Sequence, residues 1–95
     1  MAAYVIADVT VKDPDAYAEY RKHVLATVTK YGGRFLVRGG ACEPLEGGWE
    51  PGRIVVLEFP DVAAAKAWYG SSEYGPLIKV RQGASSGRLI LVEGA

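Results

Sequence analysis

The chain has 95 residues, a length that fits one domain, which we expect to span residues 1–95. Its 11 Lys and Arg residues balance 11 Asp and Glu residues, so it lacks the basic excess on which nucleic-acid binding depends. A single cysteine, Cys42, excludes an intrachain disulfide. No signal peptide opens the sequence, and no apolar run approaches the ~20 residues that cross a bilayer. We therefore expect a soluble, cytoplasmic protein with no nucleic-acid or membrane partner.

The first third of the chain predicts a strand followed by a helix. Residues 4–11 (YVIADVTV) are rich in β-branched side chains, which favour a strand. Asp13 can then cap a helix whose first position is Pro14. The helix carries an apolar stripe at spacings of three and four, and the glycine pair at 32–33 ends it. The stripe consists of Tyr17, Tyr20, Val24, Val28 and Tyr31.

The middle of the chain predicts a hairpin. Residues 34–38 (RFLVR) and 53–59 (RIVVLEF) read as strands, and the Gly- and Pro-rich segment 44–52 reads as the loop between them. We expect a bend or bulge at Gly39 and Gly40.

The last third predicts two helical segments and a final strand. Asp61 is the expected cap of the next helix, Gly70 breaks it, and a short further helix is expected from Ser72. Residues 88–93 (RLILVE) form the last predicted strand. The order predicts an α+β fold of the ferredoxin-like βαββαβ type with a four-stranded antiparallel sheet.

The strands also predict a homodimer. Residues 54–57 and 89–92 are apolar at consecutive positions, so both faces of the sheet need cover. The helices of this motif cover one face only, and the chain has no segment left for the other. A second copy packed sheet to sheet would cover it, whereas a monomer would expose an apolar face.

Three stretches of the sequence carry a resemblance to a known family. They are YGGRFLVRGG at 31–40, VLEFP at 56–60, and AKAWY at 65–69 followed by SEY at 72–74. Together they resemble the uncharacterised bacterial family DUF1330, a domain of unknown function of the dimeric α+β barrel superfamily. The family often has a proline in the second half of the first helix, where this chain has Ala26.

The resemblance runs over nearly the whole chain and implies the ferredoxin-like fold and the dimer. It implies no settled activity. Wider relatives in the superfamily include cofactor-free monooxygenases, lactone isomerases and haem-binding enzymes, which is an analogy at the level of the fold.

His23 is the only histidine, and so the one side chain expected to titrate near neutral pH in an ordinary environment. It falls at the edge of the apolar stripe, on the same side as Tyr20 and Thr27. It could line a cleft between helix and sheet as a general acid or base, or lie half exposed on the surface. The sequence leaves both open.

Glu58 and two arginines need a joint account. Glu58 shares a strand face with Ile54 and Val56, and a carboxylate in apolar surroundings needs a partner. Arg34 or Arg38 could lie across from it, depending on register. Either the pair is structural, or an arginine binds the carboxylate or polarises an anionic oxygen of a ligand.

Four aromatic residues are further candidates to contact a substrate. Tyr20 could line the cleft, together with Trp68 and Tyr69. Because Trp68 and Tyr69 are adjacent on their helix, their side chains must point in different directions. For Trp68, packing in the core is the simpler interpretation. Trp49 lies in the Gly-rich loop, where it could close over a pocket or pack on the partner subunit.

The sequence leaves two hypotheses for function. It has no phosphate loop, dinucleotide fingerprint, nucleophile elbow or zinc-ligand set, so we expect no cofactor and no metal. The first hypothesis is a cofactor-independent enzyme of isomerase or monooxygenase type that acts on a small, partly apolar substrate. In this hypothesis His23 and Arg38 are the catalytic residues. Arg34 and Glu58 are among the residues that bind the substrate. The second is a non-catalytic dimer that binds a small ligand or a protein. Whether the chain is an enzyme stays open at this level.

Overall fold

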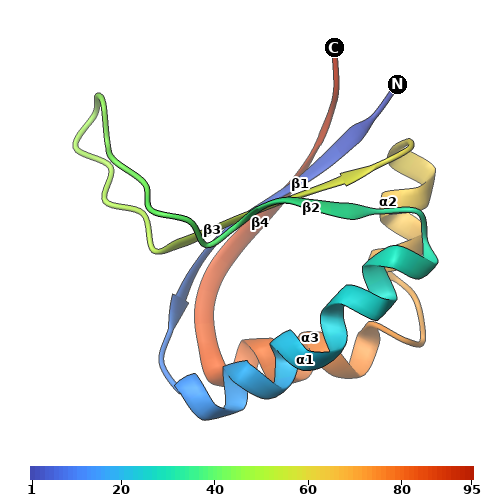
Figure 1. Cartoon of the computed structure of the whole chain (residues 1–95), viewed down its shortest axis with the longest axis horizontal. Helices are drawn as coiled ribbons and strands as arrows, with labels where there is room; N and C mark the ends of the chain where they lie inside the picture. The colour runs from blue at the N-terminus through green and yellow to red at the C-terminus, as the bar shows by residue number, and fades with distance from the viewer.

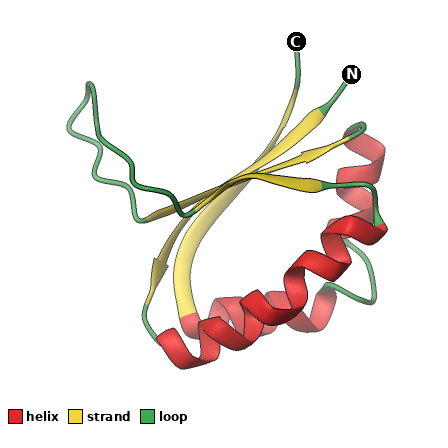
Figure 2. Cartoon of the chain, in the orientation of Figure 1, coloured by secondary structure: helices red, strands yellow, loops and turns green.

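The computed structural model describes residues 1–95 and forms one antiparallel sheet with all its helices on one face (Figures 1 and 2). The strands lie in the order β2-β3-β1-β4, which is the ferredoxin-like arrangement. None of the helices combines the length and the hydropathy that a membrane-spanning segment needs. The elements are β1 (Ala3–Val11), α1 (Pro14–Lys30), β2 (Arg34–Arg38), β3 (Arg53–Phe59), α2 (Val62–Tyr69), α3 (Gly75–Ala84) and β4 (Ser85–Glu93).

The first helix begins and ends where its sequence predicts. The backbone N–H of Ala16 donates to Asp13 Oδ1 over 3.2 Å, and Pro14 occupies the first turn. The helix ends at Lys30, and Gly32 follows with φ of +80°, a conformation that glycine adopts without strain. The predicted stripe faces the sheet, with its first four members buried and Tyr31 half-buried.

Alternation along β1 decides which side chains meet the helices. Val5, Ala7 and Val9 are buried on the helix side, and the residues between them point to the other face. The antiparallel register pairs Val5 with Leu57 of β3 and with Leu91 of β4. Val5, Val9 and Leu57 belong to one apolar core that also includes Phe59, Trp68 and Tyr74.

The chain bends at Gly39 as expected, directly after β2, with φ of +73°. The β2–β3 pair has a further irregularity, which the sequence did not predict, between Phe35 and Val37. Two expected boundaries are shifted. The second helical segment starts at Gly75, because the backbone before it turns at Ser71, whose hydroxyl oxygen accepts from Tyr74 N–H. Strand β4 starts at residue 85, since β1 is long enough to pair with three additional residues there.

The sheet face away from the helices is apolar at its centre. Ile6 of β1 pairs with Val56 of β3 on one side and with Ile90 of β4 on the other. Ile90 is 59% exposed and Val92 is 42% exposed. We call this surface the open face. Figure 1 shows no element of the chain lying over it.

Candidate functional site

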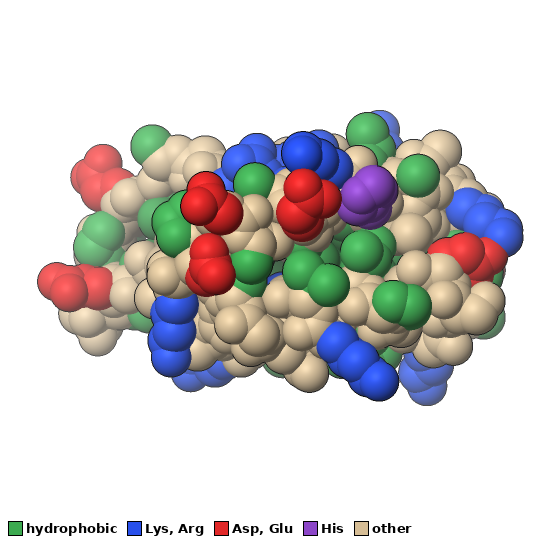
Figure 3. All heavy atoms as spheres, turned by 90° about the horizontal axis from the view of Figure 1, so that it is seen from below, with side chains coloured by type: hydrophobic (Ala, Val, Ile, Leu, Met, Phe, Trp, Pro, Cys, Tyr) green, Lys and Arg blue, Asp and Glu red, His purple; other side chains and the backbone are tan.

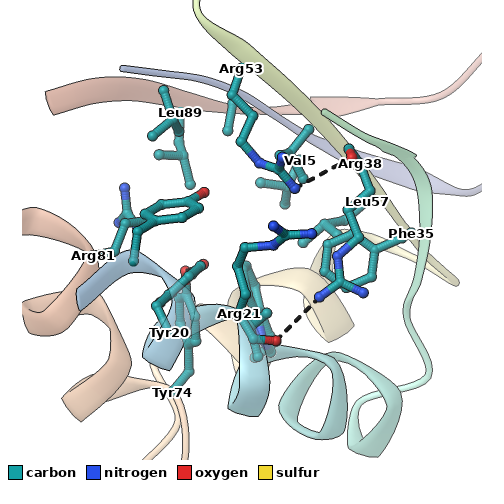
Figure 4. Close-up of a pocket in the computed structure, with 16 residues that line it drawn as sticks. Val5, Tyr20, Arg21, Phe35, Arg38, Arg53, Leu57, Tyr74, Arg81 and Leu89 are labelled. Carbon is teal, nitrogen blue, oxygen red and sulfur yellow. Dashed lines mark hydrogen bonds between the residues drawn. The ribbon is translucent and has the colours of Figure 1, made fainter. Parts of the chain in front are cut away.

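A cavity lies between α1, α3 and the helix-facing side of the sheet (Figure 4). The enclosed space is about 30 Å³, and the value rises to about 480 Å³ only when the open solvent at its mouth is included. Sixteen residues line it, of which twelve are hydrophobic and the other four are all arginine. The cavity is therefore an apolar chamber whose charged groups have a single sign.

The four arginines come from four different elements: Arg21 from α1, Arg38 from β2, Arg53 from β3 and Arg81 from α3. Arg81 is 6% exposed. No Asp or Glu lines the cavity, and the five ion pairs of the structure involve other residues. The Nε atoms of Arg53 and Arg81 are buried without a hydrogen-bond partner. Buried polar nitrogen atoms normally have such partners, so these two Nε atoms are exceptions.

Strand register brings two of these arginines to the helix side. Arg38 pairs with Val55, and Arg53 pairs with Val9, whose side chain is buried in the core. Gly39 leaves the room that the Arg53 guanidinium occupies, since a side chain at that position would overlap it. Arg53 Nη2 donates to the Arg38 carbonyl oxygen over 3.3 Å, and Arg38 Nη2 donates to the Arg21 carbonyl oxygen over 3.3 Å.

Two phenol groups meet inside the cavity. The hydroxyl oxygens of Tyr20 and Tyr74 are 2.7 Å apart. Burial raises the pKa of both side chains, and for Tyr20 the neighbouring Tyr74 raises it further. Both phenols therefore stay protonated at neutral pH. One hydroxyl proton bridges the pair, and the other is left to donate to a further acceptor.

Trp68 forms part of the cavity wall and is fixed there by its neighbours. Its ring stacks on Tyr74 with centroids 4.1 Å apart. Its Nε1–H donates to Thr27 Oγ1 over 3.0 Å, and Thr27 in turn donates to the carbonyl oxygen of Val24. The wall is thus a rigid aromatic surface, as expected for a buried Trp whose N–H has a partner.

The residues that the sequence singled out are divided among several places. Three of them, Tyr20, Arg38 and Trp68, line the cavity. His23 does not: its side chain is 64% exposed on the outer side of α1, with Nε2 3.8 Å from the carboxylate of Glu19 (Figure 3). Of the two alternatives that the sequence left open for His23, the structure shows the exposed one, because its position on the helix directs it to solvent.

Arg34 and Glu58 lie on the open face, on the other side of the sheet from the cavity. They are opposite each other in the register, and Arg34 Nε is 2.7 Å from Glu58 Oε1. Tyr4 donates its hydroxyl to Glu58 Oε2 over 3.2 Å. Of the two arginines that could pair with Glu58, register therefore selects Arg34, and Arg38 faces the cavity.

The remaining two aromatic candidates lie at the surface, in two separate places. Trp49, in the loop before β3, donates its Nε1–H to Asp8 Oδ2 over 3.3 Å and is 54% exposed. Tyr69 is 45% exposed at the end of α2, where it borders a shallow hollow beside β4. Neither side chain reaches the cavity between α1, α3 and the sheet.

Sequence reasoning did not assign the other three arginines of the cavity, or Tyr74, to a site, although a signal existed for two of these four residues. Alternation from Val55 and Leu57 places Arg53 on the helix side of its strand. A spacing of four from Leu77 places Arg81 on the inner face of its helix. The four residues are Arg21, Arg53, Tyr74 and Arg81. No group of three or more His, Cys, Asp or Glu side chains is placed to hold a metal ion.

Solved structures with the same fold have low sequence identity to this chain. A protein of unknown function from Rhodopseudomonas palustris is 21% identical with a TM-score of 0.81, over 99% of this chain and 82% of that one. SnoaB, a cofactor-independent oxygenase from Streptomyces nogalater, is 13% identical with a TM-score of 0.66, over 99% and 93% of the two chains. An antibiotic biosynthesis monooxygenase is 13% identical with a TM-score of 0.58, over 100% and 99%.

These likenesses establish the α+β ferredoxin-like fold of the chain. No curated protein matches the sequence. The family model described as "Domain of unknown function (DUF1330)" matches residues 2–95. The chain therefore belongs to the DUF1330 family, as the block at residues 31–40 and its companions had indicated.

Proposed function

We propose that this protein is a homodimer that binds a small, partly apolar molecule in the cavity between α1, α3 and the sheet. The observation that carries the proposal is the cavity's lining, in which apolar walls surround a few converging polar groups. Small-molecule sites are typically built in this way. In this proposal Tyr20, Arg38 and Trp68 contact the ligand.

The second protomer is proposed to cover the open face. Its apolar centre at Ile6, Val56 and Ile90 is flanked by polar groups, with Glu58 toward one end and Asp8 toward the other. An apolar patch with a polar rim is typical of an interface between subunits. Burying that face would also remove the ion pair of Arg34 with Glu58 from water. The pair would then help to fix how the two subunits are aligned on each other.

Catalysis without an organic cofactor is a second candidate function. Arg38 and the tyrosine hydroxyls are donors that could stabilise a developing oxyanion. The cavity lining contains no His, Asp, Glu or Lys. Any proton removed from a substrate would therefore have to pass to water or to the substrate itself. Simple ligand binding needs no such acceptor, and we place it first for that reason.

A thermal-shift screen against a metabolite library tests the proposal, because a ligand that binds only the folded state raises its apparent stability. Amide chemical shifts of ¹⁵N-labelled protein then locate each hit. We expect shifts around Tyr20, Trp68 and Tyr74, and none around His23 or Trp49. A Tyr20→Phe variant should bind hits more weakly, whereas Tyr69→Phe, outside the cavity, should not. Hits that all map to the outer surface would overturn the proposal.

A further inference from the structure

We propose that the cavity ligand is an organic acid, with a carboxylate held by the arginines and an aromatic or aliphatic body against the apolar walls. This inference rests on the proposed function, since it names the chemical class of the molecule bound at that site.

The cavity lining has an excess of positive charge. Arginine keeps its charge at any physiological pH, so the cavity lining carries four positive charges and no negative one. The chain as a whole has zero formal net charge, so this concentration does not follow from a general excess of basic residues. Burying charge is costly unless an opposite charge is present. An anion in the cavity would supply it.

Two of the arginines have hydrogen-bond donors without an acceptor. The buried Nε–H groups of Arg53 and Arg81 have no acceptor, and Arg81 is more than nine-tenths buried. A guanidinium presents Nε–H and Nη–H as a planar fork that fits the two oxygens of a carboxylate. A carboxylate within reach of these groups would satisfy donors that no side chain or carbonyl of the protein satisfies.

Three of the arginine side chains converge within the cavity. Figure 4 shows the guanidinium groups of Arg21, Arg38 and Arg53 converging from α1, β2 and β3, while the hydroxyls of Tyr20 and Tyr74 meet elsewhere in the same cavity. Arg21 is exposed and Arg38 is half-buried, so these two stand toward the mouth, whereas Arg81 is deep. The arrangement would draw an anion in and hold it beneath the strands.

The apolar walls decide which anion fits. Val5, Phe35, Leu57 and Leu89 surround the arginines, and such side chains do not replace the hydration of a small inorganic ion. An organic acid avoids this cost, because its body is apolar and only one end is charged. The hydroxyl proton left over from the tyrosine pair could bond a second oxygen on the same ligand.

The experiment compares matched acids and amides on the full chain. Isothermal titration and ¹⁵N-edited spectra would measure binding of benzoate, 4-hydroxybenzoate, phenylacetate and hexanoate, each beside its neutral amide, with inorganic phosphate as a further probe. We expect at least one acid to bind in the cavity about ten- to a hundredfold more tightly than its amide. This is the difference expected when a ligand cannot form hydrogen bonds that involve a charged group. We expect phosphate not to compete.

A matched pair of charge removals provides the control. Arg21 and Lys22 are neighbours on α1 and both are exposed, but only Arg21 lines the cavity. Arg21→Met should weaken binding of the acid by about tenfold, and Lys22→Met should leave it unchanged. Both variants keep the core intact, so a loss of folding does not obscure the result. Equal losses in the two variants would mean that only the general charge matters and would overturn the inference.

The remaining outcomes separate this inference from the proposed function. If amides bind in the cavity as well as acids, the site takes small molecules but the inference about charge is wrong. If phosphate binds as tightly as the acids, the apolar body is unnecessary and the assignment of an organic acid is wrong. If no acid binds while neutral library members do, the inference again fails and the binding function stands. The proposed function itself fails only if no molecule of either kind binds in the cavity.

Discussion

The hydroxyl oxygens of Tyr20 on α1 and Tyr74 at the start of α3 are 2.7 Å apart, although the residues are 54 positions apart in the chain. The bond joins two helices that both cover the sheet, and it lies inside the cavity. It thus serves two purposes in this account: it fixes the cavity wall, and it holds a hydroxyl proton where a ligand can accept it.

Removing one hydroxyl of this pair should weaken the fold. Tyr20→Phe leaves the Tyr74 hydroxyl buried without its partner, so we expect a loss of about 1 kcal/mol in the free energy of unfolding. Urea denaturation measures it. Tyr69→Phe is the matched control, because Tyr69 is half exposed and its hydroxyl makes no hydrogen bond, so its change should stay within about 0.5 kcal/mol. Equal effects in both variants would contradict the role given to the pair.

Arg81→Met should make the ligand-free protein more stable. The guanidinium is buried without a counter-charge, and an apolar side chain of similar length removes that cost, so we expect a gain of about 1 kcal/mol in the free energy of unfolding. Calorimetry without added anions measures it. A loss of stability of the same size would show that the protein itself compensates the charge of Arg81.

The open face should carry the dimer interface. Ile90→Glu places a charge at its centre, and we expect sedimentation velocity to show monomers where the unchanged protein sediments as a dimer. Leu25→Glu is the control: Leu25 is similarly exposed, at 47%, but lies on the outer side of α1. A dimer that withstands Ile90→Glu and dissociates with Leu25→Glu would place the interface on the helices.

His23→Ala tests the position of the histidine on the outer side of α1. Because the side chain is directed to solvent and does not line the cavity, we expect affinity for any cavity ligand and the dimer mass to stay unchanged. Titration calorimetry on the variant measures it. If a reaction is found and its rate falls by about 10²–10⁴ with His23→Ala, the histidine is the acid or base that its chemistry first suggested, and a second site is needed on that surface.

Acid should loosen the junction between α1 and α3 at Glu73. Hydrogen bonds from Lys30 and Tyr31 lower the pKa of the Glu73 carboxyl to about 2 from its ordinary value of 4.5. Because the folded-state pKa is lowered, the stabilisation is present above pH 4.5 and is lost as the pH falls from there toward 2. Glu73→Gln should reduce the change of the melting temperature with pH between these two pH values. An unchanged acid-side slope would contradict this assignment.

Much of the fold could be predicted from the sequence because its signals are local. The caps at Asp13 and Asp61 both form, with Ala64 N–H donating to Asp61 Oδ1 over 2.7 Å, and the strand at 53–59 has the predicted bounds. The start of α3 could not be predicted, since Ser71 and Tyr74 make a turn that competes with helix in the same residues.

The site was harder to predict because it depends on which residues from four elements meet. Arg38 could be chosen as a candidate, yet its separation from Glu58 follows from the irregularity after Phe35, which shifts the register of β2. Arg53 and Arg81 were not chosen, because nothing local to either residue shows that both lie beside one cavity. Only the packing of α3 against α1 and of both against the sheet brings them together.

The most direct test of the central claim, that an organic acid is held by the arginines of the cavity, is an ¹⁵N spectrum of the arginine side chains during titration with an acid and with its amide. We predict that the Nε–H signals of Arg53 and Arg81 shift downfield and become protected from exchange with benzoate, and stay in place with benzamide. An acid that binds while both signals stay in place, or equal shifts with the amide, would contradict the account.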